Sequence, residues 1–285
     1  METSERVPVI SLDEHRRDHA RLHAVIGGAL ERIGFVIVTD HGIPANLLEA
    51  AYAASAQVFD LPLEVKLRYE RLPDHQVGYT PFGVEHAKDR PDRPDLKEFW
   101  HVRNTDDGLP VEVPRFGEVC RYLSRQLGHL GNQILDHVGA YLGKPPGFFR
   151  EWTRDGRSLT RILHYPEIDA GARGLRSSEH EDINLITLLP ASTAPGLEVQ
   201  TRDGEWIPID NPPESIVVNA GDMLDMHTGG RIRSATHRVV NLPGRRFSIP
   251  HFVHPRSEIV LQEEPRVTAG EYLHQRLIEI GVIKT

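Results

Sequence analysis

Ser178-Glu179-His180-Glu181-Asp182, which leads directly into the apolar run from Ile183 to Pro190, is the stretch that decides the fold of this chain. We predict a strand over His180 to Leu189. Side chains two apart on a strand point to the same face, so His180 and Asp182 are expected to lie side by side. An imidazole and a carboxylate in this arrangement can occupy adjacent positions on a metal ion, although an isolated His-x-Asp pair is more often an ordinary surface feature.

A third metal ligand is expected from His237, in the strand-like segment from Ser234 to Val240. Two histidines and one carboxylate on a β scaffold match the ligand set of non-haem Fe(II) oxygenases, which leaves coordination positions open for a cosubstrate, a substrate and oxygen. His227, His251 and His254 compete for this role by residue type. His237 is favoured because its His-Arg-Val-Val context is followed by an Arg-x-Ser sequence on the next predicted strand.

Arg246 and Ser248 form that Arg-x-Ser sequence, and the period of two again places both side chains on one face. A guanidinium beside a hydroxyl suits a carboxylate, which it can bind through a bidentate charge-assisted pair and one further donor. A dicarboxylic acid that chelates the metal at one end is therefore expected to reach Arg246 and Ser248 with the other.

Composition restricts the classes of function. The chain has 285 residues, of which 39% are apolar and 26% charged, and a formal net charge of -8. These values are typical of a soluble globular protein and disfavour a nucleic-acid partner held through its phosphates. The single cysteine, Cys120, excludes a disulfide framework and a thiolate-rich zinc site, and we interpret it as a core residue. Because Met1 to Arg6 has no apolar signal and no run of about 18 apolar residues occurs, we predict a cytoplasmic protein without membrane insertion.

Short β-branched or alternating segments fill the chain after about Thr160, separated by turn signals such as Asp203-Gly204. About eight such strands predict a mainly β fold with supporting helices, in which the core is a double-layered jelly roll of the cupin-like, double-stranded β-helix type. The segments are Leu159 to Tyr165, His180 to Leu189, Leu197 to Thr201, Trp206 to Ile209, Ser215 to Asn219, Met223 to His227, Ser234 to Val240 and Phe247 to Phe252.

The N-terminal half is predicted to support this core. Apolar residues at helical spacing predict helices over Leu22 to Ile33, Pro44 to Phe59 and Arg115 to Leu142, and strands are expected at Val7 to Ser11, Phe35 to Val38 and Leu96 to Val102. A Thr268–Glu271 capping box begins a C-terminal helix. We expect a single domain over 1–285, with a helical and mixed region at about 1–155, the jelly-roll core at about 156–256 and the final helix at 257–285.

The order His180-x-Asp182, His237, Arg246-x-Ser248 resembles the isopenicillin N synthase-like family of 2-oxoglutarate/Fe(II)-dependent dioxygenases. The likeness covers roughly Val7 to Pro255. It includes the segments Gly34 to Ile43, Asp95 to Trp100, Gly196 to Gln200, Val218 to Asp222 and His237 to Val240. The resemblance implies a double-stranded β-helix, in agreement with the strand pattern.

The resemblance also implies the chemistry. Fe(II) would be held by His180, Asp182 and His237, and 2-oxoglutarate would chelate it while its far carboxylate meets Arg246 and Ser248. With O2, the cosubstrate would give succinate and CO2, and a ferryl intermediate would take hydrogen from the substrate, with hydroxylation as the default outcome. Tyr165 matches a family tyrosine that helps hold 2-oxoglutarate, whereas Leu163 replaces the asparagine of that segment.

The substrate is expected to be a small molecule, such as a free amino acid or a biosynthetic intermediate. Family position and residue type suggest a set of substrate-pocket candidates, namely Tyr79, Phe82, Lys97, Trp100, His101 and Phe252. Lys97, Arg231 and Arg233 have the charge to bind a substrate carboxylate, but we interpret each as a solvated cation.

Two alternatives stay open. The first is a 2-oxoglutarate-independent Fe(II) oxidase of the same fold, because such oxidases retain the Arg-x-Ser sequence. The second is a catalytically inactive, small-molecule-binding homologue, against which the intact His-Asp-His set argues. The sequence carries no signal for an oligomeric state.

Overall fold

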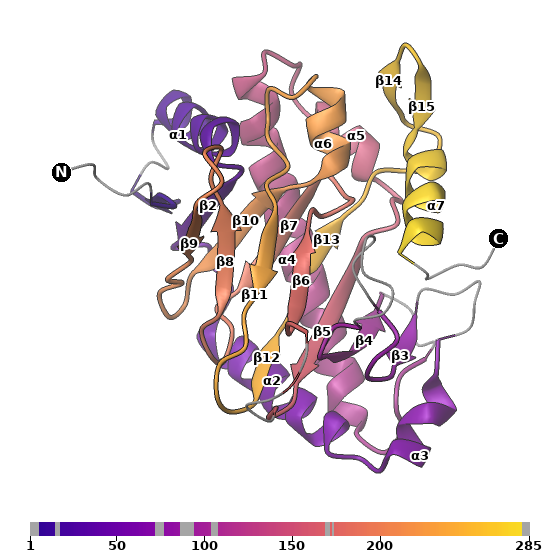
Figure 1. Ribbon diagram of the computed structural model, residues 1–285. Coiled ribbons are helices and arrows are strands. Elements are labelled where there is room, and N and C mark those ends of the chain that lie inside the picture. The colour runs from indigo at the N-terminus through magenta and orange to yellow at the C-terminus, as the bar shows by residue number, and fades with distance from the viewer. Residues whose placement is uncertain are drawn as a thin grey trace.

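A nine-stranded sheet forms the larger layer of the computed structural model, which describes residues 6–14, 18–71, 77–85, 94–103, 108–168, 172 and 174–280 (Figure 1). Its strands follow the order β1-β2-β10-β7-β13-β5-β4-β3, and β12 also pairs with β5. In chain order they are β1 (Val9–Ser11), β2 (Phe35–Thr39), β3 (Gly78–Thr80), β4 (Glu98–Val102), β5 (Leu159–Tyr165), β7 (Ile186–Pro190), β10 (Ile216–Ala220), β12 (Arg246–Ser248) and β13 (His251–Val253).

A four-stranded sheet forms the second layer, in the order β6-β11-β8-β9. Its strands are β6 (Ser177–His180), β8 (Leu197–Gln200), β9 (Trp206–Pro208) and β11 (His237–Val239). A separate hairpin joins β14 (Val260–Glu263) to β15 (Arg266–Thr268). Two facing sheets built mainly from antiparallel strands confirm the predicted jelly-roll core.

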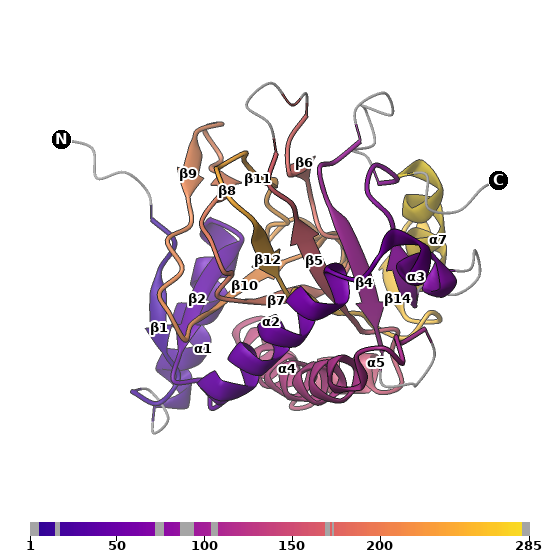
Figure 2. The same cartoon turned by 90° about the horizontal axis from the view of Figure 1, so that it is seen from below.

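Helices cover the face of the large sheet that points away from the small one, where α2 and α4 lie beneath the sheet in Figure 2. Cys120 lies in α4 and is fully buried, as predicted. The capping box at Thr268 is present at the start of α7. The helices are α1 (His19–Arg32), α2 (Ala45–Phe59), α3 (Leu63–Lys66), a 3-10 turn (Leu67–Tyr69), α4 (Pro114–Tyr141), α5 (Phe148–Thr153), α6 (Asp222–His227) and α7 (Ala269–Glu279).

The large sheet is buried on both faces, which explains why its strands read as continuous apolar runs. Along β2, Phe35 and Ile37 pack into the core between the two sheets, whereas Val36 and Val38 pack into the core beneath the helices. A strand with alternate residues in two cores has no polar face. The continuous apolar run from Phe35 to Val38 is therefore consistent with a strand, although apolar and polar residues do not alternate along it.

Three predicted strands differ from the structure. Met223 to His227 belongs to helix α6, which begins where the Asp222 amide donates to the Asp182 carbonyl. The predicted strand His180 to Leu189 is interrupted between β6 and β7. In this interval the carbonyls of Asp182 and Leu185 accept hydrogen bonds from the amides of Asp222 and Gly221, and a Cβ atom at Gly221 would lie 2.3 Å from the Asn184 carbonyl oxygen. The segment Phe247 to Phe252 is divided into β12 and β13 at Pro250, which has no amide hydrogen to continue the ladder.

Gly34 links the first helix to the segment that precedes His237. Its φ is +77°, and a Cβ atom there would lie 2.6 Å from the Arg233 carbonyl oxygen and 2.8 Å from the Ala235 Cβ. We expect Gly34→Ala to lower the free energy of unfolding by about 2–5 kcal/mol, through left-handed backbone strain and overpacking together. Urea denaturation measures the change.

Gly42 provides the matched control for this prediction. Its φ is also +77°, but nothing lies within 4 Å of the added Cβ. Gly42→Ala should therefore cost only the backbone term of about 1–2 kcal/mol. Equal losses in the two variants would contradict the close packing of Gly34 against the strand that carries His237.

The N-terminal half contributes β1 to β4 to the same sheet as β5, β7, β10, β12 and β13. We therefore propose that 1–285 forms one domain, as expected from the sequence. In the part of the chain that the structure describes, no helix combines the length and the apolar character needed to cross a membrane.

Candidate active site

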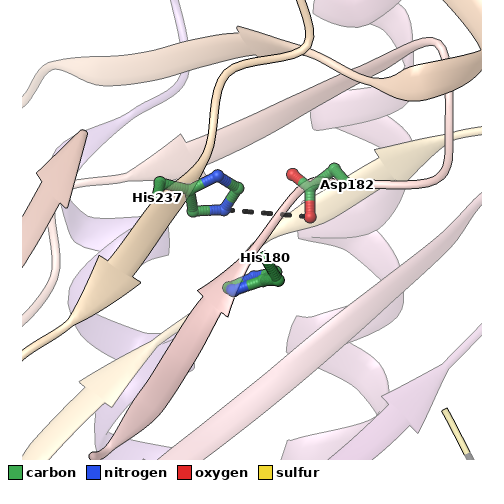
Figure 3. A group of neighbouring side chains, drawn as sticks. All are labelled: His180, Asp182 and His237. Carbon is green, nitrogen blue, oxygen red and sulfur yellow. Dashed lines mark ion pairs between the residues drawn. The ribbon is translucent and has the colours of Figure 1, made fainter. Parts of the chain in front are cut away.

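His180, Asp182 and His237 converge at one end of the small sheet, and their candidate ligand atoms all lie within 4.8 Å of one another (Figure 3). His180 is the last residue of β6 and His237 is the first of β11, and the two are direct partners in this antiparallel pair. Asp182 follows β6 in the turn toward β7. The Nε2 atom of His237 is 4.0 Å from Oδ1 of Asp182, as the dashed line in Figure 3 marks.

Both imidazoles are oriented by their own backbone. Nδ1 of His180 lies 2.7 Å from the Ser178 carbonyl oxygen, and Nδ1 of His237 lies 3.1 Å from that of Ala235. A carbonyl oxygen only accepts, so Nδ1 carries the hydrogen in each ring and Nε2 keeps its lone pair when the ring is neutral. Hydrogen bonds at the second ring nitrogen are the usual means of fixing a metal-binding histidine.

The Asp182 carboxylate is held by two neighbouring side chains. Its Oδ2 atom accepts hydrogen bonds from Thr187 Oγ1 at 2.5 Å and from Asn219 Nδ2 at 2.8 Å. Its Oδ1 atom is the one that faces His237. Three side chains therefore present two imidazole nitrogens and one carboxylate oxygen toward a common point.

Burial sets the charge states of this group. Burial and the neighbouring His237 lower the pKa of His180 to about 4. Burial alone would raise the pKa of Asp182, but the neighbouring histidines and the two hydrogen bonds outweigh it, so this pKa is lowered. A neutral His180 and an ionised Asp182 at neutral pH are the forms that bind a divalent cation.

Arg246 and Ser248 lie on β12 opposite Tyr165 and Leu163 of β5, respectively. Arg246 is only 1% exposed. Its Nε donates to the Ala194 carbonyl at 3.0 Å and its Nη2 to Ser192 Oγ at 2.8 Å, while its Cζ lies 5.0 Å from the centre of the Tyr165 ring. Its Nη1 has no hydrogen-bond partner in the described part of the chain.

Arg176 is a second buried guanidinium that the sequence analysis missed. It is fully buried, its Nη2 donates to the Gly244 carbonyl, and its Nε and Nη1 lack hydrogen-bond partners among the described residues. Burial and the charge of Arg246 lower the pKa of Arg176. Nothing in a single sequence distinguishes Arg176 from the surface arginines that are the usual case.

A cavity of about 290 Å³ lies between the His-Asp-His set and Arg246, and Arg176 is not among its lining residues. It is lined by all three members of the His-Asp-His set and by Arg246, Ser248 and Tyr165. Of the substrate candidates, Lys97, His101 and Phe252 line the same cavity, whereas Tyr79, Phe82 and Trp100 do not.

Tyr79, Phe82 and Trp100 lie outside the cavity lining. Trp100 points to the opposite face of β4 from His101 and is fully buried in the core beneath the sheet, where its indole donates to the Gly108 carbonyl. Tyr79, on β3, is also fully buried there and donates its hydroxyl to Glu98. Phe82 is 47% exposed.

The interpretation of Lys97 as a solvated cation is wrong, because its side chain is buried and paired. Its side chain is 6% exposed, and its ammonium lies 2.7 Å from Glu85, 2.8 Å from Asp95 and 3.1 Å from Ser177 Oγ. Burial disfavours its charge, but the two carboxylates outweigh burial and raise the pKa of Lys97. Arg231, which pairs with Glu31, and Arg233, which donates to the Gln200 carbonyl, do not line the cavity.

The other histidines considered as a third metal ligand lie outside the His-Asp-His set. His227 lies in α6, with its ring centre 4.5 Å from that of Trp152. His251 contacts Thr160 Oγ1 through Nδ1 at 2.8 Å, and burial lowers its pKa to about 4. His254 lines the cavity, but the His-Asp-His set is the one group of its kind found in the described ranges.

Family models match two parts of the chain. Residues 7–116 match the N-terminal model described as non-haem dioxygenase in morphine synthesis, and residues 156–255 match the 2OG-Fe(II) oxygenase superfamily. Gibberellin 20 oxidase 2 from Oryza sativa subsp. indica is 30% identical over 262 residues, which span 88% of this chain and 67% of that protein.

Solved structures show the same likeness. A 2OG-Fe(II) oxygenase family protein from Caulobacter crescentus superposes with a TM-score of 0.86 at 36% identity, covering 98% of this chain and 100% of that one. The structure of JOX2 in complex with 2OG, Fe and JA superposes with a TM-score of 0.82 at 25% identity, covering 95% and 85% of the two chains.

Proposed function

Because the chain belongs to the 2OG-Fe(II) oxygenase superfamily, we propose that its cavity uses Fe(II), 2-oxoglutarate and O2 to hydroxylate a small organic molecule. The protein is a 2-oxoglutarate/Fe(II)-dependent dioxygenase, an oxidoreductase of the class to which its relatives belong. The observation that carries the proposal is the convergence of the His-Asp-His set and the incompletely paired Arg246 on one cavity.

His180, Asp182 and His237 are the residues that would hold Fe(II). Their donor set fits this ion, because two imidazole nitrogens and one carboxylate oxygen are the ligands that non-haem Fe(II) sites use. The backbone carbonyls of Ser178 and Ala235 hold the imidazoles in place, and Thr187 and Asn219 hold the carboxylate. These four contacts fix the orientation of all three candidate ligands.

Arg246, Ser248 and Tyr165 are the residues that would hold the far carboxylate of 2-oxoglutarate. Buried guanidinium nitrogens rarely lack partners, and Arg246 and Arg176 together have three such atoms. No carboxylate pairs with Arg246 among the described residues, so an anion in the cavity would complete the hydrogen bonds of Arg246 and balance its charge, whereas Arg176 does not line the cavity. Leu163 opposite Ser248 adds an apolar wall where the family has an asparagine.

Bound Fe(II) and 2-oxoglutarate supply the oxidation, in which one atom of O2 enters succinate as CO2 leaves and the other enters a C–H bond of the substrate. The protein positions the substrate for this reaction. Phe252, His101 and Lys97 line the same cavity and would border the substrate there. A cavity of about 290 Å³ is at the small end of ligand sites, which favours a small molecule over a polymer.

Turnover should depend strictly on 2-oxoglutarate. We expect purified protein with Fe(II), O2 and a panel of small organic substrates to release succinate and a product heavier by one oxygen atom, as measured by mass spectrometry. Oxidation of a substrate in the absence of 2-oxoglutarate would instead indicate an Fe(II) oxidase. Tight binding of substrate without any 2-oxoglutarate consumption would indicate an inactive homologue.

A further inference from the structure

Arg71 lines the same cavity as the His-Asp-His set, yet its guanidinium has no ion-pair or hydrogen-bond partner among the described residues. The residue is half-buried, and its backbone amide is fixed by a hydrogen bond to the Tyr79 carbonyl at 2.9 Å. A half-buried cation beside a cavity without a counter-ion is unusual, because partly desolvated charges are normally paired.

The charged side chains near Arg71 pair with one another and not with Arg71. Glu85 pairs with Lys97 at 2.7 Å and with Arg161 at 3.0 Å, and Asp95 pairs with Lys97 at 2.8 Å. Arg161 also donates to His101 and stacks on the Phe99 ring. Two cations and two carboxylates thus form a closed network, and Arg71 adds one positive charge to this end of the cavity.

The other acids that line the cavity are already engaged. Glu179 pairs with Arg238 at 3.3 Å, Glu181 accepts from the Thr236 hydroxyl, and Asp182 belongs to the His-Asp-His set. Apart from Arg71, Arg161 and Arg246, the cavity is lined by one more arginine, Arg276, which pairs with Glu279 at 3.0 Å. None of these groups is an ion-pair partner of Arg71.

Arg71 is also distinct from the 2-oxoglutarate receptor. Its pKa is lowered by burial and by Arg161, with an opposing effect of Glu85, whereas Arg246 acts on Arg176 and Tyr52. The two residues also lie beside different strands: Arg246 pairs with Tyr165 of β5, whereas Arg71 is hydrogen-bonded to Tyr79 of β3, two strands along the sheet. An anion bound at Arg71 would be a second one, additional to the cosubstrate.

Apolar side chains complete the space available to such a ligand. Phe252 lies on β13, and Leu273, Leu277 and Ile280 reach the cavity from the C-terminal helix segment. The lining thus combines an apolar wall with one uncompensated cation, which suits an amphipathic organic acid. The planar fork of arginine matches a carboxylate bidentately.

We propose that Arg71 binds the carboxylate of the substrate, so that the substrate class of this dioxygenase is small organic acids with an apolar body. This inference rests on the proposed function. The carboxylate would hold one end of the molecule at Arg71 and leave a C–H bond of the apolar body toward the His-Asp-His set.

Binding of matched acids and amides tests the proposal. The probes are octanoate with octanamide, phenylacetate with phenylacetamide, and cyclohexanecarboxylate with cyclohexanecarboxamide. Each is titrated calorimetrically, without oxygen, into protein loaded with Fe(II) and 2-oxoglutarate, so that no turnover occurs. In at least one pair the acid should bind about tenfold or more tightly than the amide, as expected for a charge-assisted bidentate pair.

Arg71→Gln should abolish this acid preference, and Arg71→Lys should keep part of it. Arg68→Gln is the matched control, because Arg68 precedes Arg71 on the same segment but is 64% exposed and pairs with Glu112. Circular dichroism and thermal melting check that each variant is folded. Amides that bind as tightly as acids in every pair, or an acid preference that survives Arg71→Gln, would overturn the proposal.

Failure of the proposed function gives a different result. Wild-type protein that does not bind Fe(II) and 2-oxoglutarate in the loading step contradicts the dioxygenase assignment itself. Wild-type protein that loads normally but shows no acid preference contradicts only the role of Arg71.

Discussion

His180→Ala is expected to weaken Fe(II) binding by more than about a hundredfold, since the loss of a group that merely orients a metal ligand already costs about 10–100-fold. His180 offers a neutral nitrogen, because its Nδ1 hydrogen is used at Ser178 and its pKa is lowered to about 4. Alanine removes that nitrogen and leaves only Asp182 and His237. Equilibrium dialysis of Fe(II) under anaerobic conditions measures the affinity.

His251→Ala is the control for this variant. His251 is buried, and burial lowers its pKa to about 4 as well, but it contacts Thr160 and does not line the cavity. Its loss should destabilise the fold without a comparable loss of iron affinity. If both variants bind Fe(II) as the wild type does, His180 is not a ligand, and if both lose it equally, the effect is one of folding.

Arg246→Ala is expected to raise the 2-oxoglutarate concentration needed for half-maximal turnover by roughly tenfold to a hundredfold, since a hydrogen bond to a charged group contributes about 1.5–3 kcal/mol. The Fe(II) requirement should change far less, because Arg246 does not contact the His-Asp-His set. Steady-state succinate formation at varied 2-oxoglutarate and varied Fe(II) separates the two requirements.

Arg245→Ala controls for the loss of a neighbouring positive charge. Arg245 is 41% exposed, pairs with Asp60 at 2.8 Å and does not line the cavity. It should leave both requirements close to those of the wild type. Equal increases in the 2-oxoglutarate and Fe(II) requirements of Arg246→Ala would point to misfolding and not to a lost carboxylate contact.

The strands of the jelly roll were predictable where burial gave a simple pattern. Leu159 to Tyr165 and Phe35 to Val38 lie between neighbours in the large sheet, and their apolar runs coincide with β5 and β2 apart from one residue. The predicted strand through His180 and Asp182 was wrong beyond His180. The two side chains still converge, because Asp182 lies in the turn that follows β6 and its Oδ1 atom is 4.0 Å from Nε2 of His237.

Other parts of the site depend on contacts between distant segments, which a single sequence does not reveal. The sequence gives no sign that Lys97 is buried and paired, because its partners Glu85 and Asp95 are recognised only in the fold. Arg176 is buried because Gly244 and Asn241 approach it from far along the chain. Trp100 and His101 are adjacent residues of similar type, and only the orientation of β4 determines which of them faces the cavity.

The central claim is that His180, Asp182 and His237 hold the iron that works with 2-oxoglutarate. Its most direct test is an anaerobic titration of Fe(II) into protein saturated with 2-oxoglutarate, followed by the visible charge-transfer absorption that an iron-bound 2-oxo acid gives. We predict that this absorption saturates at a single iron per chain in the wild type and is absent in His180→Ala. A folded wild-type protein without the absorption, or an undiminished absorption in His180→Ala, would contradict the claim.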